Sequence, residues 1–232
     1  MVSKRSADEH EDGRAKKRSF AASDDIITVY VGPGKVRHLV HESVLCRAPF
    51  FEKCLHSGMR EQLEKAISLP EETPEDFVIL VEWLYSGTIP AKSGWSCMLR
   101  AYNAAQKFCM PDLQNALVDL FRSQMVPSSL SPEWVSYIWK STAEGCQLRQ
   151  LVLDLFYYHI SKDPSAYKKD ASADPWEMPK LYAVQLERLM AKTQLVMALF
   201  WRFADRKERP SKDPAKMKGC VYHVHEDGNK CT

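Results

Sequence analysis

The sequence contains no apolar run long enough to cross a lipid bilayer. Its longest apolar runs, such as residues 195–201, fall far short of the roughly 20 residues that a membrane-spanning helix requires. A large excess of one charge is also absent, because 32 basic and 30 acidic residues leave a formal net charge of only +2. The first residues are charged rather than apolar, unlike a secretory signal. These absences predict a globular, intracellular protein that binds neither membranes nor nucleic acid directly.

The cysteines do not form the even-numbered set that a disulfide framework requires. There are seven, and five lie inside apolar helical patterns, where a free cysteine behaves as a small buried hydrophobe. This usage favours a reducing compartment, so we expect the protein in the nucleus, the cytoplasm or both. With 232 residues and 45% hydrophobic content, the chain can bury the core of one large domain or two small ones.

Two strand candidates open the part of the chain with regular patterns. Residues 26–31 and 36–41 are rich in β-branched side chains, and the turn-forming residues 32–34 separate them, which predicts a β-hairpin. The glycines of this turn and Lys35 also suggest a phosphate-binding loop. However, no serine or threonine follows the lysine, and the next element is a strand rather than a helix. We therefore interpret this segment as a hairpin turn.

Helical spacing follows the hairpin. Residues 42–48 and 50–55 predict two short helices, and residues 66–69 predict a third short strand. The best-marked helix then begins with Thr73 as its N-cap and ends at Gly87. The predicted fold class is α+β, mostly helical with a small three-strand sheet.

Two motifs in this region resemble the BTB/POZ family. The first is HESVLCRAPFF at residues 41–51, and the second is the helix that begins PEDF at residues 74–77 and ends in Tyr85-x-Gly87. The resemblance covers about residues 25–126, and the chain is also similar to short fungal proteins that carry such a domain and little else. It implies a BTB/POZ-type domain that acts in protein–protein interaction and is not an enzyme. Ala48 replaces the serine most common in the family, so one helix-capping hydroxyl is missing.

The whole sequence divides into four predicted regions. They are a charged N-terminal tail (1–24), the BTB/POZ domain (25–126), a C-terminal helical extension (127–206) and a polar tail (207–232). A long helix over residues 180–206 is the most periodic element of the extension. It either packs on the helices of residues 131–161 or docks a partner around Phe200, Trp201 and Phe203. Its expected apolar stripe consists of Tyr182, Leu186, Leu189, Thr193, Val196, Phe200 and Phe203.

The resemblance also implies a specific partner. Some BTB domains are substrate adaptors of cullin-type ubiquitin ligases and contact the cullin scaffold through a hydrophobic-x-Glu motif after the second short helix. Met59 and Glu61 match this motif, and the helices of residues 131–206 would then recruit the substrate. The motif is short, and Met59 could equally be a loop residue that caps the core.

The charged N-terminal tail contains two separated basic clusters. They are Lys4 and Arg5, then Lys16, Lys17 and Arg18, which is the arrangement of a bipartite nuclear-import signal. The alternative is a solvated, disordered tail without a signal. The import interpretation supports a second hypothesis for the function, a nuclear scaffold that binds transcription or chromatin regulators. An array of zinc fingers or a basic recognition helix is absent, which argues against direct DNA binding.

The oligomeric state stays open in the sequence. Many BTB domains dimerise through an apolar helix and strand that precede the core hairpin, and burial of that apolar surface drives the pairing. The N-terminal tail has no such helix. We therefore expect either a monomer or a homodimer that uses another face.

The polar C-terminal tail ends in a Cys/His cluster. Cys220, His223, His225 and Cys231 provide the ligand types and the number that tetrahedral zinc requires, although the spacing matches no standard zinc finger. The alternatives are a disordered tail or a disulfide between the two cysteines. A zinc-dependent enzyme is the least supported hypothesis, because four protein ligands leave no open position for a substrate. Beyond this structural zinc, the sequence indicates no required cofactor.

Overall fold

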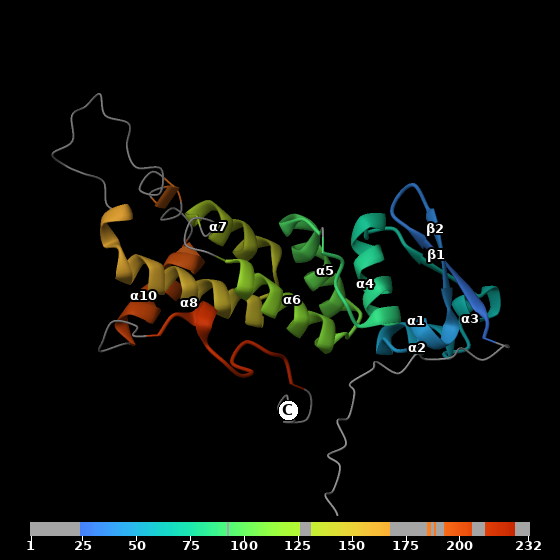
Figure 1. Cartoon of the computed structure of the whole chain (residues 1–232). Coiled ribbons are helices and arrows are strands. Elements are labelled where there is room, and N and C mark those ends of the chain that lie inside the picture. Colours follow the sequence, from blue (N-terminus) through green and yellow to red (C-terminus); the bar gives the residue numbers. More distant parts are fainter. Residues whose placement is uncertain are drawn as a thin grey trace, which may run out of the picture.

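The computed structural model describes residues 24–91, 93–125, 131–167, 185–186, 188, 193–205 and 212–225. The chain is mostly helical with one small sheet, so the α+β prediction is confirmed. Figure 1 shows the sheet at one end of an elongated molecule and helices α8 (Gln147–Lys162) and α10 (Thr193–Ala204) at the other end. Helices α4 (Pro74–Ser86), α5 (Trp95–Lys107) and α6 (Pro111–Gln124) lie between them. No helix in these ranges is both long enough and apolar enough to span a bilayer.

The sheet has three strands in the order β2-β1-β3. Strands β1 (Ile26–Val31) and β2 (Val36–His41) form the predicted hairpin, and β3 (Ala66–Leu69) pairs with β1 in parallel. The hairpin turn uses positive φ angles at Gly32 (74°) and Lys35 (49°), which suits the glycine and is uncommon for the lysine. The phosphate-loop alternative is excluded, because a strand follows this turn.

Three short helices lie between β2 and β3 in the sequence: α1 (Glu42–Leu45), α2 (Pro49–Leu55) and α3 (Arg60–Glu64). The sequence predicts the first two, and their buried residues include Leu45 and Phe51. Helix α3 was not expected from the sequence. It buries no residue, so it has no apolar periodicity from which a helix could be inferred.

Ala48 is the N-cap of α2 and makes no side-chain capping bond. We expect Ala48→Ser to raise the free energy of unfolding by about 0.5–1 kcal/mol, because a hydroxyl can accept a hydrogen bond from the first turn of the helix. Urea unfolding of the full chain measures this change. Ala48→Val is the control: the site is fully buried, so extra volume without an acceptor should destabilise the protein. A destabilised serine variant would show that this cap position cannot use a hydroxyl.

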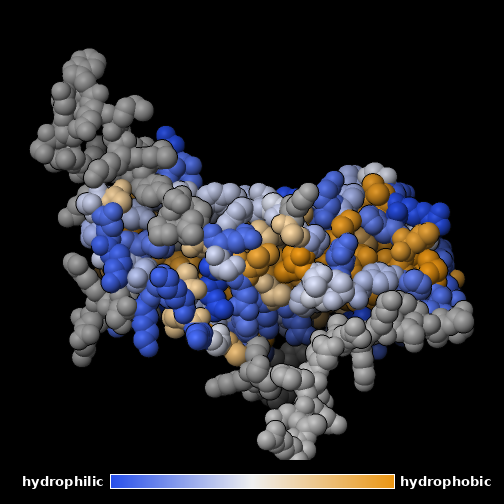
Figure 2. Space-filling model, viewed as in Figure 1, coloured by the Kyte–Doolittle hydropathy of each residue, from blue (hydrophilic) through white to orange (hydrophobic). Residues whose placement is uncertain are grey.

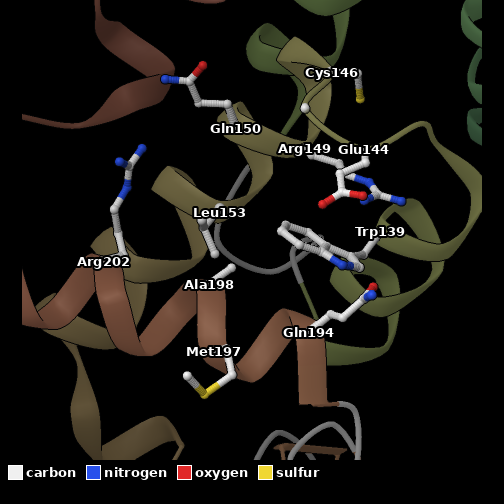
Figure 3. Close-up of a pocket in the computed structure, with 11 residues that line it drawn as sticks. Trp139, Glu144, Cys146, Arg149, Gln150, Leu153, Gln194, Met197, Ala198 and Arg202 are labelled. Carbon is white, nitrogen blue, oxygen red and sulfur yellow. The ribbon is translucent and has the colours of Figure 1, made fainter.

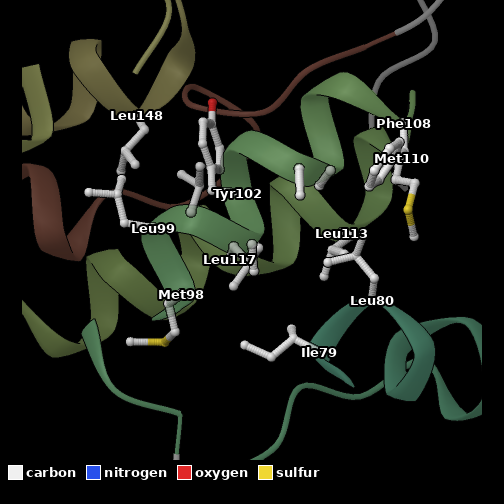
Figure 4. Close-up of a cluster of buried hydrophobic side chains, with 14 of the residues drawn as sticks. Ile79, Leu80, Met98, Leu99, Tyr102, Phe108, Met110, Leu113, Leu117 and Leu148 are labelled. Carbon is white, nitrogen blue, oxygen red and sulfur yellow. The ribbon is translucent and has the colours of Figure 1, made fainter. Parts of the chain in front are cut away.

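Helix α4 (Pro74–Ser86) has the predicted ends. Thr73 caps it by accepting a hydrogen bond from the Asp76 amide (3.3 Å), and Gly87 ends it with a φ of 71°. Helices α5 (Trp95–Lys107) and α6 (Pro111–Gln124) follow. Figure 4 shows how α4, α5 and α6 meet in one buried apolar cluster, which Leu148 of α8 joins. The helical extension therefore continues the same core. The labelled cluster residues are Ile79, Leu80, Met98, Leu99, Tyr102, Phe108, Met110, Leu113, Leu117 and Leu148.

The two sequence motifs contact each other in space. The hydroxyl of Tyr85 lies 2.7 Å from Nδ1 of His41 and accepts a hydrogen bond from the His41 amide at 3.1 Å. The guanidinium of Arg47 donates to the carbonyl oxygen of Leu84 at 2.7 Å. These bonds join the end of the hairpin and the start of α1 to the C-terminal end of α4. The motifs thus have a structural role, which is to hold the sheet against the helices.

The extension consists of α7 (Pro132–Ser141), α8 (Gln147–Lys162), a short 3-10 helix (Pro164–Ala166) and α10 (Thr193–Ala204). Ser131 caps α7, because its hydroxyl accepts a hydrogen bond from the Trp134 amide at 3.3 Å. Helix α10 packs against α8, which confirms the expectation that the extension folds back on itself.

Helix α10 buries a different face from the one predicted by the spacing of its apolar residues. Leu195 and Leu199 are buried, at 1% and 8% exposure, whereas Phe200 and Phe203 of the expected stripe are 55% and 41% exposed. The expected stripe was therefore wrong over this helix. The helix is apolar on several sides, and spacing alone cannot select one of them. The expected residues Tyr182 and Leu189 lie outside the described residues, and so does the side chain of Thr193.

Residues 212–225 form an ordered segment that packs on α6 and α8, with a 3-10 helix at Pro214–Lys216. Tyr222 is 1% exposed, and its hydroxyl donates to Asp154 at 3.0 Å. Asn115 of α6 pairs with both backbone groups of Val224, at 2.7 and 3.0 Å. The disordered-tail alternative is therefore wrong for this segment, which long-range contacts hold in place.

Candidate interaction surface

The hydrophobic-x-Glu motif, matched by Met59 and Glu61, begins at an exposed turn between α2 and α3. Gly58 has a φ of 76°, and Met59 then forms the N-cap of α3 with 63% of its surface exposed. Leu63, one turn further along α3, is 83% exposed. Met59 therefore does not cap the core, and two large apolar side chains stand together on a short helix.

Glu61 lines a shallow depression between α3 and the sheet, with a volume of about 580 Å³. Its charge contributes to the raised pKa of the Cys54 thiol, although burial of that thiol is the larger cause. Glu61 forms no ion pair with another described residue, whereas its neighbour Arg60 is paired with Glu64 at 2.6 Å. The carboxylate of Glu61 is therefore available to an external cation. The depression is lined by Tyr30, Lys35, Arg60, Glu61, Glu64, Ala66, Ile67 and Ser68.

The outer face of the sheet extends this region. Tyr30 and Leu39 are 37% and 55% exposed, because their strands turn the alternate residues inward. Figure 2 shows apolar side chains gathered at the sheet end of the molecule. We call the combination of Tyr30, Leu39, Met59, Glu61 and Leu63 the sheet–α3 surface. Exposed apolar side chains around an unpaired charge are typical of a protein-binding site.

A second concave region lies in the helical extension. A groove of about 640 Å³ runs between the end of α7, the start of α8 and α10. Figure 3 shows Trp139 and Arg149 on one side of it and Met197 of α10 on the other. The guanidinium of Arg149 stacks 4.9 Å from the Trp139 ring and donates to the backbone of Thr142. The groove combines apolar side chains with charged ones of both signs, Glu144, Arg149 and Arg202, and it lies far from the sheet–α3 surface (Figure 1).

This fold agrees with the result of a comparison between the sequence and models of known protein families. The BTB/POZ domain model matches residues 19–124. The chain carries a BTB/POZ domain. BTB/POZ domains are protein–protein interaction modules that often dimerise, and the family is generally non-enzymatic. Among curated proteins, none matches the chain.

The BTB/POZ domain contains one of the three predicted sites in full. Met59 and Glu61 both lie on the sheet–α3 surface. The basic residues Lys4, Arg5, Lys16, Lys17 and Arg18 of the predicted import signal lie outside the described residues.

The predicted zinc ligands are only partly described. Cys220, His223 and His225 are partly buried beside α6, and His223 Nε2 lies 3.1 Å from Asp119. Where the structure describes the chain, these three residues do not bring their ligand atoms within 4.8 Å of one another. Cys231 lies outside the described residues. The zinc hypothesis for this cluster stays a prediction.

Sequence reasoning missed the contributions of Leu63 and of the outer sheet face. Leu63 lies in α3, which carries no helical periodicity. The sequence of strand β1, IITVYV, did contain a signal, because it is apolar on both faces. Such a strand either is buried on both faces or leaves one apolar face exposed to solvent or to a binding partner. Which face is exposed depends on the pairing of β1 with its neighbours.

Proposed function

We propose that the chain is a BTB-type adaptor whose sheet–α3 surface binds a cullin-type scaffold. The observation that supports this most is Met59, which matches the motif of the resemblance and is 63% exposed at the start of α3. In this proposal Met59 and Leu63 fill an apolar pocket on the scaffold. Glu61 pairs with a cationic group beside that pocket. Burial of such anchors at the centre of an interface supplies most of its binding free energy.

The extension provides the second binding region that an adaptor needs. Its groove between α7, α8 and α10 lies apart from the sheet–α3 surface, so both can be occupied at once (Figures 1 and 3). The exposed apolar side chains of α10, Phe200 and Trp201, lie on the same helix that forms one wall of the groove. In this proposal the extension recruits the substrate protein.

The variant Met59→Ala/Glu61→Lys is expected to weaken binding of a purified cullin scaffold by about 30-fold or more, since it removes an apolar anchor and reverses a charge. Both positions are at least partly exposed, so the fold should be retained. Calorimetry with the full chain measures the affinity. The matched control is Met197→Ala/Glu144→Lys, which changes the same residue types at exposed positions of the extension.

Affinity purification of the two variants separates the roles of the two regions. Partners that Met59→Ala/Glu61→Lys no longer captures belong to the ligase scaffold. Substrate proteins should still be captured by this variant. Equal affinity of the scaffold for the parent chain and for Met59→Ala/Glu61→Lys would refute the proposed binding mode.

A further inference from the structure

Three metal-ligand side chains from two helices converge beside the sheet. Glu42 is the first residue of α1, Cys46 follows one turn later, and His56 is the C-cap of α2. Their ligand atoms all lie within 4.8 Å of one another, and His56 Nε2 is 3.5 Å from Glu42 Oε1. Helical spacing places Glu42 and Cys46 on one face, and the turn around Ala48 brings His56 back to it.

The ring of His56 is oriented for coordination. Its Nδ1 lies 3.1 Å from the carbonyl oxygen of Glu52. Because a carbonyl oxygen can only accept a hydrogen bond, Nδ1 carries the proton and the neutral ring keeps its lone pair on Nε2. Nε2 is the atom that approaches Glu42. Histidines that bind metals commonly donate their other ring N–H to a backbone carbonyl in this way.

The charges around Cys46 favour a cation. Burial raises the pKa of the Cys46 thiol to about 11, and the negative charges of Glu42, Glu52 and Asp24 contribute further. Besides His56 in the cluster, the basic groups that act on these carboxylates are Lys65, which interacts with Glu42, and His41, which interacts with Asp24. The thiol is therefore protonated at neutral pH, and a divalent cation bound here would be attracted by the same carboxylates. Its charge would also stabilise the thiolate.

We propose that Glu42, Cys46 and His56 form a zinc-binding site. Sulfur, imidazole nitrogen and carboxylate oxygen are the ligands that zinc accepts, whereas Mg²⁺ and Ca²⁺ require oxygen ligands. Tetrahedral zinc with bonds of about 2.0–2.3 Å holds its ligands roughly 3.3–3.8 Å apart. The 3.5 Å separation of His56 Nε2 and Glu42 Oε1 already meets this requirement, and the sulfur of Cys46 lies within 4.8 Å of both atoms.

The site is open to solvent on one side. The side chain of His56 is 55% exposed and that of Glu42 is 26% exposed, and Cys46 lies partly buried beneath them. Three protein ligands leave the fourth tetrahedral position to water. Because the set lies on α1 and α2 and precedes Met59, it is independent of the Cys/His cluster near the C-terminus.

Cobalt(II) tests the site, since it replaces zinc in such sites and its thiolate complexes have a charge-transfer absorption. The experiment uses the full chain with Cys220→Ser and Cys231→Ser, which removes the C-terminal candidate ligands. We expect one equivalent of Co²⁺ to produce the thiolate absorption, and Cys46→Ser to abolish it. Cys54→Ser is the matched control: this cysteine is partly buried, like Cys46, but it lies on α2 and is not part of the set, so the absorption should remain.

Zinc competition against bound Co²⁺ then measures affinity. His56→Asn changes an exposed residue, so it should leave thermal unfolding of the metal-free chain unchanged while weakening zinc binding at least about 100-fold. The proposal is overturned if the thiolate absorption survives Cys46→Ser, which would assign it to another cysteine such as the exposed Cys109, or if no absorption develops.

Discussion

Asp154→Ala is expected to lower the free energy of unfolding by about 3 kcal/mol, because it removes the shared partner of a buried hydroxyl and a partly buried guanidinium. Asp154 is 6% exposed and lies on α8. Its carboxylate forms an ion pair with Arg202 of α10 and accepts a hydrogen bond from the buried hydroxyl of Tyr222 at 3.0 Å. Alanine would leave a partly buried guanidinium and a buried hydroxyl without this partner, which is costly in an apolar environment.

This carboxylate joins three parts of the chain that the sequence separates widely. Loss of it should release residues 212–225 and loosen α10, so limited proteolysis should cut the C-terminal segment faster in the variant. Urea unfolding of the full chain measures the change in stability. Asp119→Ala is the matched control, because Asp119 also contacts the C-terminal segment, through His223, but its side chain is 43% exposed. Its replacement should cost less than about 1 kcal/mol. Equal losses in the two variants would show that burial of Asp154 is not the cause.

The second large effect is expected for Arg100→Met, at about 2–3 kcal/mol of unfolding free energy. Asp76, in the first turn of α4, has a side chain only 3% exposed. Arg100 of α5 holds it with two hydrogen bonds, of 2.6 and 3.1 Å. Methionine keeps most of the aliphatic stem but leaves the buried carboxylate without its cation. The start of α4 offsets part of this loss, because helix N-termini stabilise negative charge.

Two further variants test this explanation by urea unfolding. Arg60→Met removes an arginine of a similar pair, with Glu64, whose side chains are 82% and 50% exposed, and should cost no more than about 0.5 kcal/mol. The double variant Asp76→Asn/Arg100→Met should recover part of the loss, since the buried charge is then absent as well. A double variant as unstable as the sum of both single changes would mean that the two residues contribute independently.

Local signals account for the elements that the sequence predicts well. The ends of α4 follow from Thr73, Pro74 and Gly87, whose backbone preferences act within one helical turn. The hairpin follows from two β-branched runs and the turn between them. The family motifs extend this to the whole domain, and residues 19–124 match the BTB/POZ model. The exposed position of Met59 also agrees with the motif that singled it out.

The remaining features depend on contacts between distant residues. Helix α3 buries nothing, so no pattern marks it. The rotation of α10 is set where Leu195 and Leu199 meet α8 and Arg202 reaches Asp154, and a helix with several apolar sides does not encode that choice. The order of residues 212–225 comes from Tyr222 and Val224, whose partners lie 68 and 109 positions away.

By itself, the sequence determined the BTB/POZ domain, the three strands, the ends of α4, and the residues that match the hydrophobic-x-Glu motif. It did so because caps, turns and periodic apolar positions act between neighbours in the chain. Only the tertiary structure decided which apolar side chains stay exposed beside that motif, that the C-terminal segment packs on α6 and α8, and that His56 meets Glu42 and Cys46. Those outcomes depend on how separate elements pack, since burial and charge pairing are settled by neighbours in space.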